Sequence, residues 1–374
     1  MERLSRSQLF VLTVFFQIGT TIIFGFGGAA GKDAWIVTIV SMLLGLGAIG
    51  MYLTLMSLNP GLTLVEWFPA QFGKWIGTPI AWFYPLLGLY EAARGLNDVK
   101  FVTTTLILYE TPYIVIVIFF VLVCAYIQLC GIEVLGRMSE IFFPYLLITI
   151  FLTILFVFIS DILQMENLQP ILKDGWAPIL KASFPLGASQ GFAQTLELAM
   201  IWSIVKASKK DIIKITILGT LFSGLMIFLI VIVIIAGIGE FSYKTENFPM
   251  FTLVSKVDIG EVIKNLDIFA VILFIISAFF KISLHMFFAI RGIQILLKIN
   301  NSRRIIIPIT VLSIYLGYSV SWNFQEHLQV AIEVFPYNLW ILLLWGFPIL
   351  LLMVTLIKYY AKKRKSEVGT NKER

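Results

Sequence analysis

The chain has few charged side chains: only 13% of its 374 residues are Asp, Glu, Lys or Arg, whereas soluble domains carry roughly 25%. It also has only two cysteines, Cys124 and Cys130, which lie in one hydrophobic segment and lack the spacing of a metal or redox site. Neither a zinc-type His-Glu-x-x-His motif nor a nucleophile elbow is present. These absences argue against a soluble protein, a disulfide framework and an enzyme, and we expect neither a metal nor a cofactor.

Hydrophobic residues make up 59% of the chain, and the mean hydropathy is +0.92. They fall in runs of about 20 residues, which is the length that a transmembrane helix requires. The first run is longer than the core of a signal peptide, so we count it as a span. We expect one all-α integral membrane domain (1–374) of about ten transmembrane helices, at residues 9–31, 34–58, 79–107, 112–131, 141–162, 183–205, 212–238, 266–290, 305–321 and 337–359.

The positive charges indicate how these spans are oriented. An even number of spans places both termini on one side, and with cytoplasmic termini 19 of the 28 Lys and Arg residues fall in inner segments, six in outer loops and three within spans. The net charge of +6 therefore reflects topology and predicts no nucleic-acid partner. The basic tail, residues 360–374, is expected to meet the anionic inner leaflet, as an anchor or as a regulatory docking site.

The spans divide into two halves, at about residues 9–162 and 183–359. Because each half has five spans, an odd number, the halves insert with opposite orientations, as inverted repeats do. Each half opens with a span that small or helix-breaking residues interrupt, namely Gly19 and Gly25 in the first and Pro185 in the sixth. Matched broken helices in opposed halves indicate a binding site near the middle of the bilayer.

Unwinding at these positions would expose backbone groups to a ligand. A half-helix presents about half a positive charge at its N-terminus, which favours a carboxylate, and freed carbonyl groups accept an ammonium group. An amino-acid zwitterion requires both, although the glycines would equally allow close helix packing. The candidate ligand-binding residues are Gly19, Thr20, Thr21, Phe24 and Gly25 in the first span, Phe184, Gly187 and Ala188 in the sixth, and Tyr90 in the third.

Ionisable residues within the spans form a second group of candidates. Glu91, Arg94 and Asp98 share one face of the third span, where their charges can pair. Charged groups inside a membrane face the bundle interior or a wet cavity. They form either a structural ion-pair network or a functional element such as a gate or a proton or cation path.

Two later spans carry further intramembrane polar groups. Glu197 in the sixth span is a candidate complement of Arg94 or of a ligand ammonium group. In the eighth span Lys281 and His285 lie four residues apart and share a face. His285 is either a hydrogen-bonded packing residue or a proton relay.

Several motifs carry a resemblance to a known family. They are Ile18-Gly19-Thr20, Gly31-Lys32-Asp33-Ala34-Trp35-Ile36, Glu110-Thr111-Pro112 and, most specifically, Gly131-Ile132-Glu133-Val134-Leu135-Gly136-Arg137-Met138-Ser139-Glu140-Ile141-Phe142-Phe143-Pro144. With these, nearly the whole chain resembles the B subunits of spore germinant receptors, the spore-permease family of the amino acid, polyamine and organocation superfamily. It departs from that superfamily's opening Gly-x-Gly and proline, because Thr21 and Phe26 stand near those positions.

The resemblance implies a fold, a role and partners. The implied fold is LeuT-like, with ten helices in two inverted repeats and a pocket between the broken first and sixth spans. The implied role is sensing of nutrients that trigger germination, together with a membrane-spanning A subunit and a lipoprotein C subunit in the spore inner membrane.

Within the longest motif, Glu133 precedes Arg137 by four residues and Glu140 follows Arg137 by three. The first spacing is favourable for a helical ion pair. We expect a cytoplasmic amphipathic turn in which these residues either pair with one another or contact a partner subunit or a gate.

The predicted function is a germinant-receptor subunit that binds a nutrient such as an amino acid. Binding would act through differential affinity for two arrangements of the bundle. One alternative is an amino acid transporter coupled to protons or sodium through Glu91, Arg94 or Glu197. Another is a channel or water pore gated by a partner.

Overall fold

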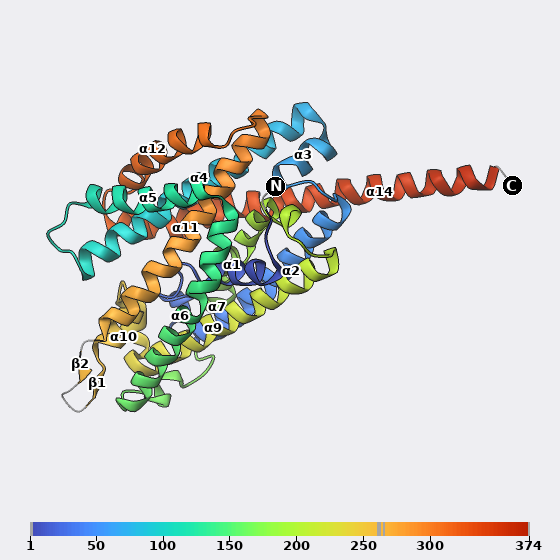
Figure 1. The fold of residues 1–374 in the computed structure, drawn as a ribbon. Coiled ribbons are helices and arrows are strands. Elements are labelled where there is room, and N and C mark those ends of the chain that lie inside the picture. Colours follow the sequence, from blue (N-terminus) through green and yellow to red (C-terminus); the bar gives the residue numbers. More distant parts are fainter. Residues whose placement is uncertain (1–2, 260–262, 265, 373–374) are drawn as a thin grey trace.

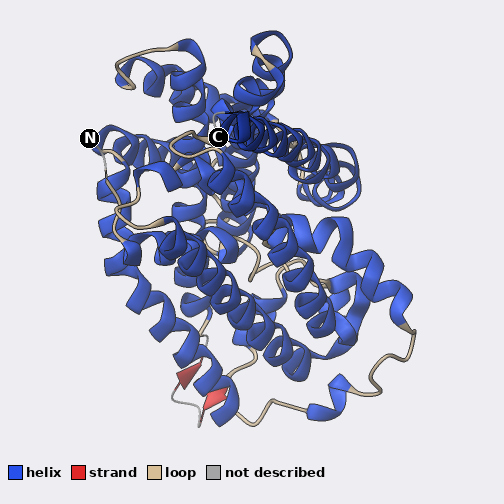
Figure 2. Ribbon diagram, turned by 90° about the vertical axis from the view of Figure 1, so that its right-hand side faces the viewer, coloured by secondary structure: helices blue, strands red, loops and turns tan. Residues whose placement is uncertain are grey.

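A computed structural model describes the backbone of residues 3–259, 263–264 and 266–372, and nearly all of it is helical (Figure 1). Within these ranges the only sheet is an antiparallel pair of short strands, β1 (Asp258–Ile259) and β2 (Ile263–Lys264). The two strands lie at one end of the helical bundle (Figure 2). The structure therefore confirms the all-helical fold class.

Six helical segments of the described chain are long and apolar enough to cross a membrane. A seventh candidate is a pair of helices, Arg303–Ser319 and Phe324–Val334, that bends by 109°. Such lengths match the hydrocarbon core of a bilayer, which confirms a multi-pass membrane protein. The six are Gly28–Leu58 (η1 and α2), Tyr113–Cys130 (α5), Ile132–Ile159 (α6), Lys209–Thr245 (α9), Asp267–Leu297 (α11) and Pro336–Arg364 (η7 and part of α14).

Three of the ten predicted spans are not uniformly apolar helices, and each has a visible reason. Helix α1 (Arg6–Ile18) has only 13 residues because the chain unwinds after it. The sixth span is divided into short helical pieces between Trp176 and Ile204. Helix α4 (Lys74–Leu106) has 33 residues but carries four charged side chains in its second half.

The bounds of the elements not yet given, together with the parts of the composite spans, complete the fold. They are η1 (Gly28–Asp33), α2 (Ala34–Leu58), α3 (Leu64–Phe72), η2 (Met165–Leu168), α7 (Trp176–Ala182), η3 (Ser183–Gly187), α8 (Ala188–Gly191), η4 (Ala193–Met200), η5 (Trp202–Ile204), α10 (Pro249–Ser255), α12 (Arg303–Ser319), α13 (Phe324–Gln329), η6 (Val330–Val334), η7 (Pro336–Gly346) and α14 (Phe347–Lys372). Helix α14 carries the expected basic tail away from the bundle (Figure 1). Residues 373–374 of that tail lie outside the described residues.

One predicted boundary is wrong. The fifth span was expected to begin at residue 141, after a cytoplasmic turn, but helix α6 begins at Ile132. Three charged residues interrupt the apolar run but do not break the helix. Glu133, Arg137 and Glu140 therefore lie on its first three turns. Gly131 precedes the helix with φ of 89°.

Helix α1 lies in the middle of the bundle and is held there by aromatic and polar contacts. Phe15 stacks on Phe280 of α11 with ring centroids 4.2 Å apart. This stacking anchors the C-terminal part of α1, just before the chain unwinds. Gln17, 1% exposed, donates through Nε2 to Thr195 Oγ1 at 2.7 Å and to Thr220 Oγ1 at 2.9 Å, and its Oε1 accepts a hydrogen bond from Ser223. This cluster of hydrogen bonds joins α1 to η4 and α9.

Replacing Gln17 by leucine should lower the stability of the protein by about 2–4 kcal/mol, because in a region of low dielectric Thr195 Oγ1 loses its partner and the Thr220 and Ser223 hydroxyl groups each lose one of two hydrogen bonds. Thermal unfolding of the purified protein in detergent measures the loss. The matched control is Gln329→Leu, since the exposed Gln329 amide bonds only to Glu333, at 3.2 Å. Equal melting temperatures for Q17L and Q329L would contradict the structural role of the hydrogen bonds of Gln17.

Candidate functional site

The first helix breaks where the sequence predicts it. Helix α1 ends at Ile18, and Gly19 has φ of 41° and ψ of −129°, a backbone conformation that residues other than glycine rarely adopt. A Cβ on Gly19 would also lie 2.2 Å from Lys281 Cδ. Both the backbone angle and the close approach of Lys281 therefore require glycine at this position.

The sixth helix breaks twice. Phe184 is extended within η3, with φ of −134° and ψ of 133°, beside the predicted helix breaker Pro185. A second kink follows at Phe192, with φ of −132° and ψ of −47°. The prediction that the first and sixth helices are broken is thus confirmed, and each kink of the sixth has a helix-breaking residue beside it, Pro185 at the first and Gly191 at the second.

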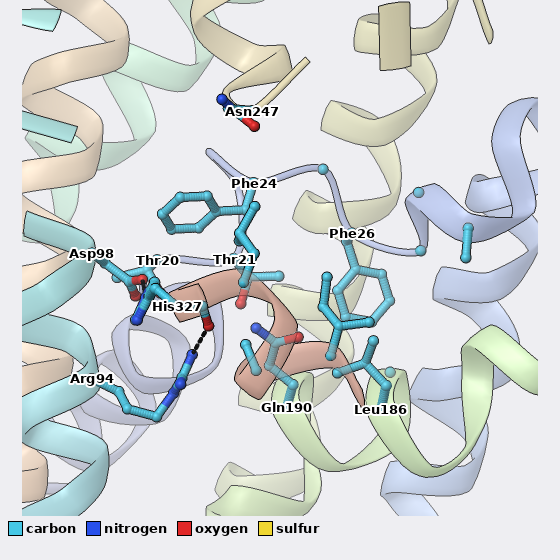
Figure 3. Close-up of a pocket in the computed structure, with 18 of the residues that line it drawn as sticks. Thr20, Thr21, Phe24, Phe26, Arg94, Asp98, Leu186, Gln190, Asn247 and His327 are labelled. Carbon is cyan, nitrogen blue, oxygen red and sulfur yellow. Dashed lines mark hydrogen bonds and ion pairs between the residues drawn. The ribbon is translucent and has the colours of Figure 1, made fainter. Parts of the chain in front are cut away.

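The two breaks face one cavity of about 390 Å³. Figure 3 shows Thr20 and Thr21 on the unwound segment after α1, with Arg94, Asp98 and His327 to one side and Gln190 and Leu186 to the other. Such a volume lies within the range of small-molecule sites, roughly 300–1,000 Å³.

The cavity reaches the surface near the C-terminal end of helix α9. Lys244 and Thr245, the last two residues of α9, and Glu246 and Asn247, which follow it, line the cavity and are exposed. We call these four residues the mouth. Helix α9 bends at Gly239, where φ is 77°, and residues 209–238 before the bend separate its start from the mouth, at about 1.5 Å per residue.

Five of the nine predicted ligand-binding residues line this cavity. They are Thr20, Thr21, Phe24, Gly25 and Gly187. Phe24 stands between the two threonines and Asn247 of the mouth (Figure 3). Their role as ligand contacts stays a prediction.

The other four lie outside the described lining of the cavity. Tyr90 stacks on Phe335, with ring centroids 4.6 Å apart, and Phe184 is 40% exposed. Ala188 is fully buried, and Gly19 is covered by the Lys281 side chain.

The intramembrane charges gather at the same cavity, with one exception. Glu91, Arg94, Asp98, Lys281 and His285 line it. Glu197 lies behind this layer, and its Oε2 is 2.9 Å from His285 Nδ1. Glu197 thus pairs with the histidine of α11, an arrangement that differs from the expected complement of Arg94.

The expected pairing within α4 is not what the structure contains. In the part of the chain that the structure describes, no ion pair joins Glu91, Arg94 and Asp98 to one another. Each side chain instead finds a partner in the last helices: Glu91 Oε1 accepts a hydrogen bond from Trp340 Nε1 at 2.7 Å, and Arg94 Nη2 donates to the His327 carbonyl oxygen at 3.3 Å. The helix face that carries the charges is turned toward the cavity and these helices.

His327 is a site residue that sequence reasoning missed. Its Nε2 lies 2.7 Å from Asp98 Oδ1, and its side chain is 1% exposed. The residue fell between the ninth and tenth predicted spans and was counted as loop, whereas α13 and η6 fold back into the bundle there. The sequence offered one signal for it: histidine is rare in this chain, which has only two.

Several polar atoms of the cavity wall lack a protein partner. Buried polar groups in proteins are nearly always hydrogen-bonded. Four such atoms of cavity-lining residues have no hydrogen-bond partner among the residues that the structure describes: Thr21 Oγ1, Arg94 Nη1, Gln194 Oε1 and His285 Nε2. Each of these atoms is itself buried in the structure, so a polar guest that binds them requires a small rearrangement of the surrounding side chains. No cluster of three or more His, Cys, Asp or Glu side chains suited to a metal occurs in the described residues.

Comparison with known proteins agrees with this architecture. Residues 3–325 match the spore permease family model, described as "Spore germination protein". Spore germination protein KB of Bacillus subtilis is 27% identical over 365 residues, covering 98% of this chain and 97% of the relative. Spore germination protein XB of Bacillus anthracis is 24% identical, covering 69% of this chain and 71% of the relative.

A solved transporter has the same fold. The structure of Mhp1, a nucleobase-cation-symport-1 family transporter in a closed conformation with bromovinylhydantoin bound, matches with a TM-score of 0.70 and 13% identity, covering 94% of this chain and 78% of Mhp1. At this identity the match establishes the fold alone, which is LeuT-like. The family match covers most of the chain, and the chain therefore belongs to the spore permease family of spore germination proteins.

Proposed function

We propose that this chain is the nutrient-binding membrane subunit of a spore germinant receptor and that its ligand is an amino acid. The observation that carries the proposal is the set of four unpartnered polar atoms around one cavity at the two helix breaks. An apolar ligand would leave these groups unsatisfied, at a cost of about 1–3 kcal/mol each. A small polar ligand would satisfy them.

The charges favour a zwitterion in one orientation. Glu91, Arg94 and Asp98 alternate in sign along one helix face and all line the cavity. Arg94 Nη1 is available for a carboxylate, and guanidinium groups bind carboxylates strongly. The ammonium group then lies near an acidic side chain of α4 or a freed carbonyl of the first break. Thr21, Gln194 and His285 are left to contact the ligand side chain.

Binding would act by favouring one of two bundle arrangements, which requires a difference in affinity between them. The names of the relatives, all spore germination proteins, support the same role here. We further propose that A and C receptor subunits receive the signal and that the chain resides in the spore inner membrane with both termini cytoplasmic. Residues 9–162 and 183–359 would be its inverted repeats within a single domain, followed by the tail 360–374.

A binding screen tests the proposal. Purified protein is titrated with the standard amino acids by calorimetry, and the ligand found is then titrated into Thr21→Val. Loss of one neutral hydrogen bond, about 1 kcal/mol, should weaken binding roughly fivefold to tenfold.

The matched control is Thr13→Val. Thr13 lies in the same helix, is fully buried, and its Oγ1 donates to the Leu9 carbonyl oxygen at 2.7 Å, away from the cavity. Affinity should be unchanged in T13V. Equal affinities for T21V and the wild type would show that the ligand does not meet the first helix break, and a panel without any binder would overturn the amino acid assignment.

The transporter fold supports a second candidate, an amino acid transporter coupled to protons or sodium. Liposomes that contain the purified protein distinguish the two functions. Accumulation of the ligand against its gradient would support transport. Binding without flux, together with loss of one germination response on gene deletion, would support sensing.

A further inference from the structure

The first described residues of the chain cross the end of the bundle that lies opposite the mouth. Leu4 N donates to the Ile204 carbonyl oxygen at 3.1 Å, and Lys206 N donates to the Leu4 carbonyl oxygen at 2.8 Å. The Leu4 side chain is fully buried. We call residues 3–8 the strap. Through Leu4, the strap joins the start of the broken first helix to the end of the broken sixth helix.

A second anchor ties the strap to the start of α9. Arg6 Nη2 lies 2.8 Å from Asp211 Oδ2. Asp211 belongs to the first turn of α9, whereas the mouth comprises the last two residues of α9 and the two that follow. The strap and the mouth are therefore at opposite ends of the same long helix.

Helix α6 provides the seat on which the strap lies. Glu133 Oε1 accepts a hydrogen bond from the Arg3 backbone N at 2.6 Å. Two helical turns further on, Glu140 accepts from Gln8 Nε2 at 3.0 Å and also from Ser7. A third contact comes from Ser5 Oγ, 3.5 Å from Glu140 Oε1. Hydrogen bonds to carboxylates are roughly twice as strong as neutral ones.

Between the two carboxylates, Gly136 leaves room for the strap. A Cβ at Gly136 would lie 2.9 Å from Leu4 Cδ2 and 3.2 Å from Gln8 Cδ. Positions 133, 136 and 140 share one helix face. Arg137 lies at the edge of this face and points to solvent: its side chain is 72% exposed, and its Nη2 is 3.9 Å from Glu133 Oε2. The spacing of the motif thus places two carboxylates and a glycine against the strap, and it also allows an i,i+4 ion pair.

We propose that the strap is a latch that keeps the bundle closed below the cavity, and that Glu133 and Glu140 are the residues that hold it. The two helices whose breaks line the cavity are both fixed by the strap to α6 and α9 at this end. Releasing the strap would let them separate from α6, and closure elements of this kind switch between discrete arrangements. The latch is independent of the ligand, so it does not rest on the proposed function.

Cysteine accessibility tests the latch. A parent protein carries Cys130→Ser, which leaves the buried Cys124, and Gln190→Cys as a reporter in the cavity wall. A membrane-impermeant, positively charged methanethiosulfonate reagent is applied to vesicles of either orientation. In the parent, Q190C should react from the mouth side and be protected from the strap side.

Glu133→Gln combined with Glu140→Gln should raise the labelling rate from the strap side by about tenfold or more, the population change expected when charge-assisted hydrogen bonds are lost. The glutamine at position 140 also turns an NH₂ group toward donors. Gly136→Val, which displaces Leu4 without removing a charge, should have the same effect. Arg137→Gln is the matched control in the same motif and should leave both rates at the parent value.

Labelling from the mouth side identifies folded protein, because it requires an intact cavity. If both E133Q/E140Q and G136V keep the parent rate from the mouth side and also keep strap-side protection, the latch is wrong. If the double variant loses mouth-side labelling, the strap-side labelling of G136V alone tests the latch, since G136V keeps both carboxylates. Faster strap-side labelling of R137Q to the same extent would equally overturn the assignment of Glu133 and Glu140.

Discussion

Replacing Arg94 by methionine is expected to weaken amino acid binding by about 100-fold to 1,000-fold. The substitution keeps the length of the side chain but removes the only guanidinium group that lines the described cavity. A ligand carboxylate would then be buried without its guanidinium partner, which costs about 2–5 kcal/mol, and 1.4 kcal/mol corresponds to a factor of ten. Calorimetric titration with the amino acid found for the wild type measures the change.

Two further variants give this result its meaning. Arg94→Lys keeps the charge but loses the planar fork that binds carboxylates in a bidentate manner, so its affinity should fall between those of the wild type and R94M. Arg291→Met removes an arginine outside the cavity lining and should bind normally. Wild-type affinity in R94M would show that the carboxylate lies elsewhere, for instance at a backbone N-terminus of the broken helices.

Gly19→Ala is expected to lower the free energy of unfolding by about 2–5 kcal/mol, the largest effect on stability that we predict for one methyl group. The backbone at Gly19 has φ of 41°, where non-glycine residues are strained by about 1–3 kcal/mol. The new Cβ would lie 2.2 Å from Lys281 Cδ, and overpacking of this kind adds about 1–3 kcal/mol. Thermal unfolding in detergent measures the sum.

The control lies in α2. A Cβ at Gly47 would meet no atom within 4 Å in the structure described, so Gly47→Ala should be neutral or stabilising by up to about 1 kcal/mol. Adding Lys281→Ala to G19A should relieve the steric part and leave the backbone part, with a coupling energy of about 1–3 kcal/mol. If G19A and G47A melt at the same temperature, the first helix is not held open at Gly19.

The sequence predicts the helical bundle well because apolar length decides whether a segment crosses a membrane. The bounds of the second span, 34–58, agree with α2 to the residue. The start of α6 was misplaced because hydropathy registers charges, whereas a helix tolerates them when a neighbouring segment binds them. Glu133 and Glu140 are bound by residues about 130 positions away, and no local pattern reveals such contacts.

The candidate site was predicted in part for the same reason. Glycine, threonine and charge in apolar surroundings are local signals, and they indicated Thr20, Thr21 and Arg94, which line the cavity. The partners of the α4 charges depend instead on how the last helices fold back. His327 and Trp340 are therefore identified only by the three-dimensional arrangement.

The position of those two partners along the chain has a consequence for the site. The family model ends at residue 325, just before His327 and Trp340, which hold Asp98 and Glu91 in place. The broken helices that line the cavity lie within the matched portion, whereas these two partners lie beyond it, in a stretch that the alignment with Spore germination protein KB, over 98% of this chain, nevertheless includes. Substituting the two partners would therefore change the charges that face the cavity and leave the broken helices in place.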